Sequence, residues 1–135
     1  MESVRIYKLK WFKRWASKEG VSDGLLKVAI AEMQKGLVDA DLGANVYKKR
    51  VPLLGQGKSG SVRTLIAFQV DNKAFFIYGF SKNVRSNVSV KETKALKLLA
   101  KELLNYSDAQ LKKAIDSGSV EEVKQRERKY FRCSA

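Results

Sequence analysis

Histidine is absent from the 135-residue chain, and Cys133 is its single cysteine. Without histidine, no Ser-His-Asp, Cys-His or paired-histidine ribonuclease site can form within the chain. A zinc site built from Cys and His is excluded for the same reason, and we predict neither a metal nor another cofactor. One cysteine cannot form an internal disulfide, which suits a reducing compartment.

Long apolar runs are also missing from this sequence. No stretch approaches the about 20 residues that span a bilayer, and residues 1–12 lack the apolar core of a signal peptide. The basic residues do not follow one amphipathic helix, so no membrane role is expected. Because 44% of the residues are hydrophobic, the chain can build a packed core. We therefore expect one soluble, cytoplasmic domain over residues 1–123 and a basic C-terminal extension over 124–135.

Acidic residues are the scarce charge, with 14 Asp and Glu against 27 Lys and Arg, for a net charge of +13. The deficit is concentrated in residues 45–91, where nine basic residues meet one acidic residue, Asp71. In the flanking thirds the acids are interleaved with the bases, as on an ordinary solvated surface. The nearly unopposed middle third instead indicates a polyanionic partner such as nucleic acid.

Hydrophobic patterning predicts an α+β fold. Alternation of apolar and polar residues predicts strands over 4–9, 46–51, 62–70 and 73–80. Asp71-Asn72 predicts a tight hairpin between the last two strands. Strand 73–80 is apolar on both faces and is therefore expected at the centre of the sheet.

Helical spacing of apolar residues predicts two helices between the first strand and residue 46, and further helices after residue 89. The first ends at Gly20, the second runs from Ser22 or Asp23 to Gly36, and residues 37–44 form a connection. Ser-x-x-Glu/Gln capping boxes begin at Ser89, Ser107 and Ser119, the last before a charged, helical or frayed segment. The predicted order is β-α-α-β-β-β-α-α, a small antiparallel sheet with helices packed on one face.

Several cations should converge at one end of this sheet. In an antiparallel hairpin, Arg63 lies opposite the segment from Phe80 to Lys82, while Lys49 and Arg50 lie on the preceding strand and Arg85 follows. Lys58 sits in a glycine-rich loop over 55–60 whose backbone N–H groups could face an anion. Alone, that loop would be a plain turn with a solvated lysine.

Aromatic residues interleave with these cations. Alternation puts Phe76, Tyr78 and Phe80 on one face of their strand, and we expect Tyr78 and Phe80 to keep an open ring face for unstacked RNA bases. Trp11 and Trp15 are expected in the core, where they would pack their helix onto the sheet.

Such a site permits RNA cleavage without a metal, although it does not require it. The 2′-OH can attack the adjacent phosphate once a base removes its proton, and Lys58 or Lys82 can serve as that base when neighbouring charges lower its pKa. Arg63 can clamp the phosphoryl oxygens, and Tyr78 can protonate the leaving oxygen. The RNA-binding residues would be Lys49, Arg50, Phe80 and Arg85.

The sequence resembles the RelE/HigB-like toxins of bacterial type II toxin–antitoxin systems over about residues 4–123. The resemblance rests on Leu42-Gly43, Lys49-Arg50-Val51, the stretch from Gly57 to Arg63 and the stretch from Phe76 to Asn83. It implies the small RelE/ParE fold, a metal-independent mRNA endoribonuclease that commonly acts on the ribosome, and inhibition by an adjacently encoded, DNA-binding antitoxin. The family pattern often has Gly and an aromatic residue where this chain has Ser61 and Val62.

Two alternatives remain open at this point. A non-nuclease toxin of the same fold would bind a protein target such as gyrase, and a basic RNA-binding module would bind without cleaving. Under the toxin hypothesis, an acidic antitoxin segment laid over the basic middle third would exclude RNA.

Overall fold

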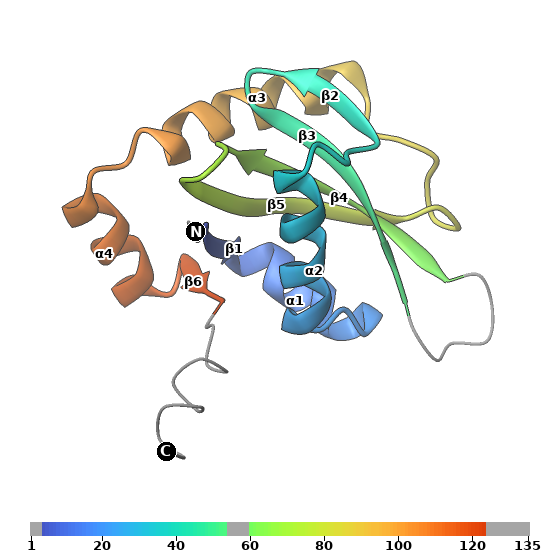
Figure 1. Ribbon diagram of the computed structural model, residues 1–135, viewed down its shortest axis with the longest axis horizontal. Helices are drawn as coiled ribbons and strands as arrows, with labels where there is room; N and C mark the ends of the chain where they lie inside the picture. The colour runs from blue at the N-terminus through green and yellow to red at the C-terminus, as the bar shows by residue number, and fades with distance from the viewer. Residues whose placement is uncertain (1–3, 54–59, 124–135) are drawn as a thin grey trace, which may run out of the picture.

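A mixed six-stranded sheet forms the centre of the computed structural model, which describes residues 4–53 and 60–123 (Figure 1). The order of the strands across the sheet is β2-β3-β4-β5-β1-β6. The strands are β1 (Arg5–Leu9), β2 (Ala40–Gly43), β3 (Val46–Pro52), β4 (Ser61–Phe68), β5 (Lys73–Ser81) and β6 (Val120–Glu122). The helices are α1 (Lys10–Glu19), α2 (Asp23–Gln34), α3 (Val90–Leu104) and α4 (Asp108–Ser117). The α+β class is therefore confirmed.

The direction of one strand corrects the predicted antiparallel sheet. β1 runs parallel to β5, with Tyr7 opposite Phe75, whereas every other neighbouring pair in the described sheet is antiparallel. A parallel pair needs a long crossover, and the intervening helices and hairpins supply it. β5 lies between β4 and β1, so its predicted central position is confirmed.

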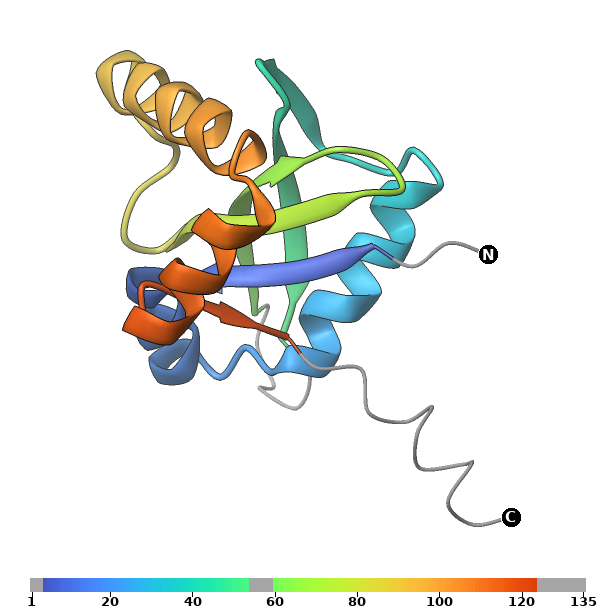
Figure 2. The ribbon, with the colours of Figure 1, turned by 90° about the vertical axis from the view of Figure 1, so that its left-hand side faces the viewer.

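The helices cover both faces of the sheet, not one as predicted. Figure 2 shows α3 and α4 on one side and α2 on the other. Phe12 of α1 and Leu26 of α2 pack with Val62 and Phe76 of the sheet. On the opposite face, a second cluster includes residues of α3, α4 and the strands: Ala100, Leu103, Leu111, Leu65, Phe75 and Ile77. Strands apolar on both faces require cover on both, and this is the physical reason for the second layer.

Two strands were not predicted from the sequence. β2 lies in the expected connection 37–44, where it pairs with β3 as a short edge strand. β6 occupies the supposed capping box at Ser119: it pairs with β1, and Val120 is buried. Glu121 forms ion pairs with Lys8 and Lys13. In both places, pairing with a neighbouring strand outweighs the local signal.

Local signals elsewhere predicted the structure correctly. Ser22, Ser89 and Ser107 cap the helices that follow them, the latter two in complete capping boxes. Asp71 adopts a φ of 59° at the turn between β4 and β5. A β-bulge between Leu65 and Ile66 disrupts the register of this hairpin. Because β5 carries the extra residue, Phe76 joins the α1/α2 side and Tyr78 the α3 side, which corrects their predicted shared face.

Candidate nucleic-acid site

Two arginines lie directly opposite each other at one end of the sheet. Arg50 of β3 pairs with Arg63 of β4, and Arg63 pairs in turn with Phe80 of β5. Val62 is opposite Ser81, so the exposed Lys82 follows at the same end. The predicted adjacency of Arg63 and the segment from Phe80 to Lys82 is confirmed.

No carboxylate pairs with the side chain of either arginine within residues 4–53 and 60–123. The Arg63 Nη1 donates to Ser61 Oγ at 3.3 Å, and the backbone N–H of Arg50 donates to Asp39, but neither guanidinium forms an ion pair with a described residue. Like charges directly opposite on neighbouring strands are destabilising. An anion between them would relieve that repulsion, so the pair has the electrostatics of a phosphate site.

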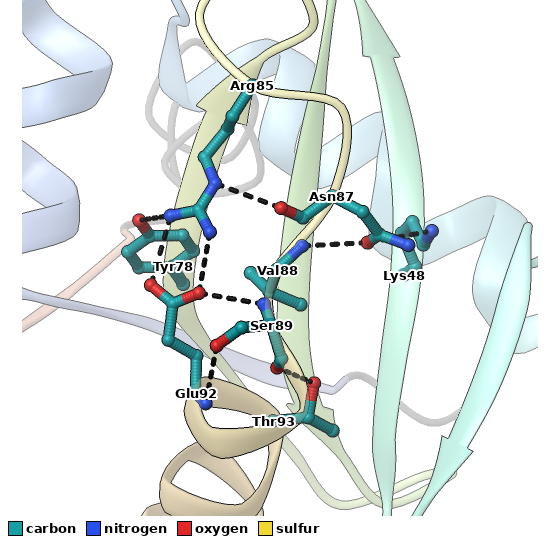
Figure 3. A network of polar contacts seen from close by, with 8 residues as sticks. All are labelled: Lys48, Tyr78, Arg85, Asn87, Val88, Ser89, Glu92 and Thr93. Atoms are coloured by element: carbon teal, nitrogen blue, oxygen red, sulfur yellow. Dashed lines mark hydrogen bonds and ion pairs between the residues drawn. The ribbon is translucent and has the colours of Figure 1, made fainter.

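Arg85 belongs to a separate network, in which its charge is paired with that of Glu92 (Figure 3). Its guanidinium donates to both carboxylate oxygens of Glu92, at 2.6 and 3.0 Å, and its Nη1 also donates to Tyr78 Oη at 3.2 Å. The Nε donates to the carbonyl of Asn87 at 2.9 Å. Glu92 is the capping-box acid at the start of α3 and accepts from the Ser89 N–H.

The pKa values of this network reflect its pairing. Hydrogen bonds from Arg85 and Ser89 lower the pKa of Glu92 to about 2, and the Glu92 carboxylate raises the pKa of Arg85. Both groups are therefore charged at any physiological pH. The predicted RNA-binding residue Arg85 is thus already paired, and it instead fixes the position of the Tyr78 hydroxyl. Because Tyr78 Oη accepts this hydrogen bond, its own proton remains available to a further acceptor.

Trp11 is a site residue that the sequence analysis missed. Its ring stacks on Tyr78 with centroids 5.0 Å apart and an interplanar angle of 8°, and it lies parallel to Trp15 at 6.4 Å. Trp11 is 48% exposed, so its predicted place in the core is wrong. Phe12 and Ala16, one turn apart, take the buried face of α1. In the sequence, the apolar pair Phe12 and Ala16 therefore indicated which face of α1 is buried, and Trp11 lies to one side of that face.

Two side chains that were predicted to bind RNA are instead buried in the folded protein. Phe80 is only 3% exposed, which corrects the expectation of an open ring face. Lys49 is 7% exposed, and its Nζ pairs with Glu32 at 2.8 Å and donates to the Leu37 carbonyl at 3.0 Å. The Lys49 side chain points away from its neighbour Arg50 because successive residues of a strand face opposite sides. Both residues are therefore built into the structure rather than offered to a ligand.

Lys58 lies outside the described residues. In the described ranges, no group of three or more Asp, Glu, Cys or His residues could hold a metal ion. No helix found in those ranges is both long and apolar enough to cross a membrane.

Residues 4–123 match the family model of the RelE toxin of the RelE/RelB toxin–antitoxin system. The chain belongs to the RelE toxin family. The match includes all of the described residues, and the mixed sheet with four helices is consistent with the RelE fold. Membership implies a cognate antitoxin as the partner of this toxin. The comparison with curated proteins finds no matching sequence.

Proposed function

We propose that the toxin is a metal-independent endoribonuclease that cleaves mRNA, in association with the ribosome, and so arrests translation and growth. The observation that supports this most is the Arg50–Arg63 pair, whose guanidinium groups form no ion pair with a described residue. The neighbouring strand β5 carries Tyr78, two residues before the Phe80 that pairs with Arg63. A site of this charge attracts the RNA backbone and repels divalent cations. The toxin cleaves mRNA in the cytoplasm, and an adjacently encoded, DNA-binding antitoxin binds the toxin and inhibits it.

The arginines act as the phosphate clamp. Arg63 holds the scissile phosphoryl oxygens and Arg50 the neighbouring phosphate, since a guanidinium presents paired N–H donors that match two oxygens. As the 2′-OH attacks, negative charge grows on the phosphorane, and the fixed cations stabilise that charge more than they stabilise the ground state. Removing one such group costs about 10²–10³ in rate.

Proton transfer falls to Lys82 or Lys58 and to Tyr78. In this proposal one of these lysines accepts the proton of the 2′-OH. Tyr78 donates its proton to the leaving 5′-oxygen. The Arg85–Glu92 pair holds the phenol in place through the 3.2 Å hydrogen bond from Arg85.

The Trp11 ring provides the stacking surface that was expected of Phe80. Trp11 is half exposed, and its inner face is held by Tyr78. A base laid on the exposed part of Trp11 would extend this aromatic stack. Base–aromatic stacking is worth about 1–3 kcal/mol, so Trp11→Ala should weaken RNA binding by about tenfold or more.

The test is controlled induction of the toxin in bacteria, with growth and mRNA 5′ ends recorded in the same cells. Wild type should produce new 5′ ends within reading frames, and Arg63→Ala, Lys82→Ala and Tyr78→Phe should each abolish or strongly reduce them. Lys73→Ala is the matched control, because Lys73 begins the same strand β5 at its opposite end. It removes the same charge and should leave cleavage intact.

Three results would count against the proposal. Growth arrest without new 5′ ends would indicate a protein target, and gyrase inhibition assays would then identify the gyrase-poison alternative. Salt-sensitive RNA binding without cleavage in a purified translation extract would indicate a binding module. Cleavage that survives both Arg63→Ala and Lys82→Ala would place the chemistry elsewhere.

A further inference from the structure

A groove of about 680 Å³ lies along α3, at the other end of the sheet from the Arg50–Arg63 pair. Its walls come from α3, from the β2–β3 turn at Ala44 and Asn45, and from Gln69 after β4. Val46 begins β3 beside this turn, and Arg50 is four residues further along the strand. At about 3.3 Å per residue, the two sites are separated by about 13 Å along β3.

The helical wall of the groove is basic and partly apolar. Its α3 residues recur every three or four positions, as one face of a helix requires: Lys94, Lys97, Leu98, Lys101, Leu104 and Asn105. Leu98 is 70% exposed. The side chain of Lys97 extends to Gly43 of β2: a Cβ added to Gly43 would lie 3.4 Å from the Lys97 Nζ. Within the described part of the chain, these three lysines form no ion pair.

The composition of the walls favours a polypeptide over a nucleic acid as the occupant. A single RNA strand is held by aromatic stacking and by cations, and no aromatic ring lines this groove in the described residues. An exposed leucine among lysines is matched by a segment that carries both carboxylates and apolar side chains. An acidic amphipathic segment would neutralise the lysines and cover Leu98 in one contact.

We propose that this α3 groove (Lys94, Lys97, Leu98, Lys101 and the β2–β3 turn) is the docking surface for an acidic amphipathic segment of the cognate antitoxin. The inference rests on membership of the toxin family and not on the nuclease activity proposed above. Under this proposal, two binding sites lie at opposite ends of the sheet: RNA binds at the Arg50–Arg63 end, and the antitoxin binds at the other. Charge reversal in the groove should then release the toxin from its antitoxin without touching the RNA site.

The experiment measures the dissociation constant of the full-length toxin and its antitoxin by calorimetry, beside a growth-rescue assay with both proteins expressed. The test variant is Lys94→Glu/Lys97→Glu/Lys101→Glu. Each exposed ion pair is worth about threefold in affinity, so the Kd should rise by about 30-fold or more. The matched control is Lys18→Glu/Lys35→Glu/Lys113→Glu, three exposed lysines from other helices or their caps, which should keep the wild-type Kd to within about threefold.

A second, uncharged variant tests the nature of the occupant. Leu98→Gln leaves the fold intact, because the side chain is mostly exposed, and it should weaken antitoxin binding by about threefold to tenfold while RNA binding is unchanged. Amide hydrogen exchange should show protection of residues 94–105 on addition of antitoxin. Neither readout depends on whether the toxin cleaves RNA.

The expected result is a toxic triple variant that the antitoxin no longer rescues, with a raised Kd. An unchanged Kd in the triple variant overturns the proposal. If the Kd is unchanged but the salt dependence of RNA or ribosome binding falls by about three charges, the groove belongs to nucleic acid, and the proposal is likewise wrong.

Discussion

Replacing Gly79 by alanine should destabilise the toxin through one neighbour, Trp15. Gly79 lies in the central strand β5, where its φ is not positive, so the backbone itself accepts alanine. A Cβ at this position would, however, lie within 2.6 Å of three ring carbons of Trp15. Ordinary van der Waals contact begins near 3.4 Å and the nearest ring carbon would lie at 2.2 Å, so the indole must move by more than an ångström.

The expected cost follows from overpacking a site with little room to yield. Trp15 packs against Phe12 at 5.4 Å and parallel to Trp11 at 6.4 Å, so its displacement shifts the stacked rings as a group. Inserting a methyl group into such a site costs about 1–3 kcal/mol. For a domain of this size, a loss of about 2 kcal/mol lowers the Tm by about 6–10 °C.

The assay is a double-mutant cycle measured by urea unfolding. Trp15→Ala removes the obstructing ring, so Gly79→Ala in that background should change the free energy of unfolding by no more than about 0.5 kcal/mol. The coupling energy should therefore be about 2 kcal/mol. Gly24→Ala is the matched control: the added Cβ would meet only Ser22 Oγ, at 3.7 Å, and alanine in a helix should raise stability by up to about 1 kcal/mol.

The refuting result is simple. If Gly79→Ala costs the same with and without the Trp15 ring, the clash is not the cause, and the close packing of α1 on β5 is wrong. If the coupling is present but Trp fluorescence does not change, the ring moves without disturbing Trp11, and Gly79 is then irrelevant to the RNA site.

Three further substitutions test individual side chains. The Tyr7 hydroxyl is buried without a hydrogen-bond partner among the described residues, so Tyr7→Phe should raise the free energy of unfolding in urea by up to about 1 kcal/mol; a loss would reveal a hidden partner. Burial also raises the pKa of Tyr7 above 10.0, so the wild type should lose stability as the pH rises through that raised value, and Tyr7→Phe should lose less in alkaline melts. Glu92, with its pKa lowered to about 2 by Arg85, stabilises the fold fully above pH 4.5 and loses that effect as the pH falls toward 2. Glu92→Gln should flatten the Tm profile over that range, and an unaltered profile would contradict the pairing. Lys49→Met loses the ion pair with Glu32 but keeps its buried stem, so stability should fall by about 1 kcal/mol or less with toxicity intact; loss of toxicity in a folded variant would return Lys49 to the RNA site.

Local rules predicted those parts of the structure that local interactions determine. Ser89 and Ser107 each present a hydroxyl to the backbone three residues later, and no distant residue is needed for that. The short connection at Asp71-Asn72 makes β4 and β5 a hairpin, so the start of β4 lies opposite the end of β5 and Arg63 lies beside Phe80. The convergence of cations at one end of the sheet was therefore predictable from the sequence.

Features that depend on distant partners were not predictable in this way. The bulge at Leu65/Ile66 reverses the alternation of side chains beyond it, and nothing in the local composition announces it. Ser119 looks like a helix cap, but Leu9 of β1 pairs with Val120 and makes the segment a strand. From the sequence, Lys49 and Arg85 were predicted to be available to RNA. Their carboxylate partners, Glu32 and Glu92, lie on other helices or strands, so the local sequence did not reveal these ion pairs.

The structure thus divides the basic middle third into two kinds of cation. Lys49 and Arg85 are neutralised by ion pairs within the fold. Arg50 and Arg63 lie opposite each other, and neither guanidinium forms an ion pair with a described carboxylate, although Asp39 accepts a hydrogen bond from the Arg50 backbone N–H. Folding alone would favour a neutral residue at one of these two positions, because opposed like charges cost stability. Such local conflicts are characteristic of functional sites. Under the proposed function, an anion resolves this conflict, and the stacked Trp11 and Tyr78 rings favour one that carries bases. This combination, rather than the total charge of +13, is our reason for proposing RNA as the ligand instead of a general polyanion.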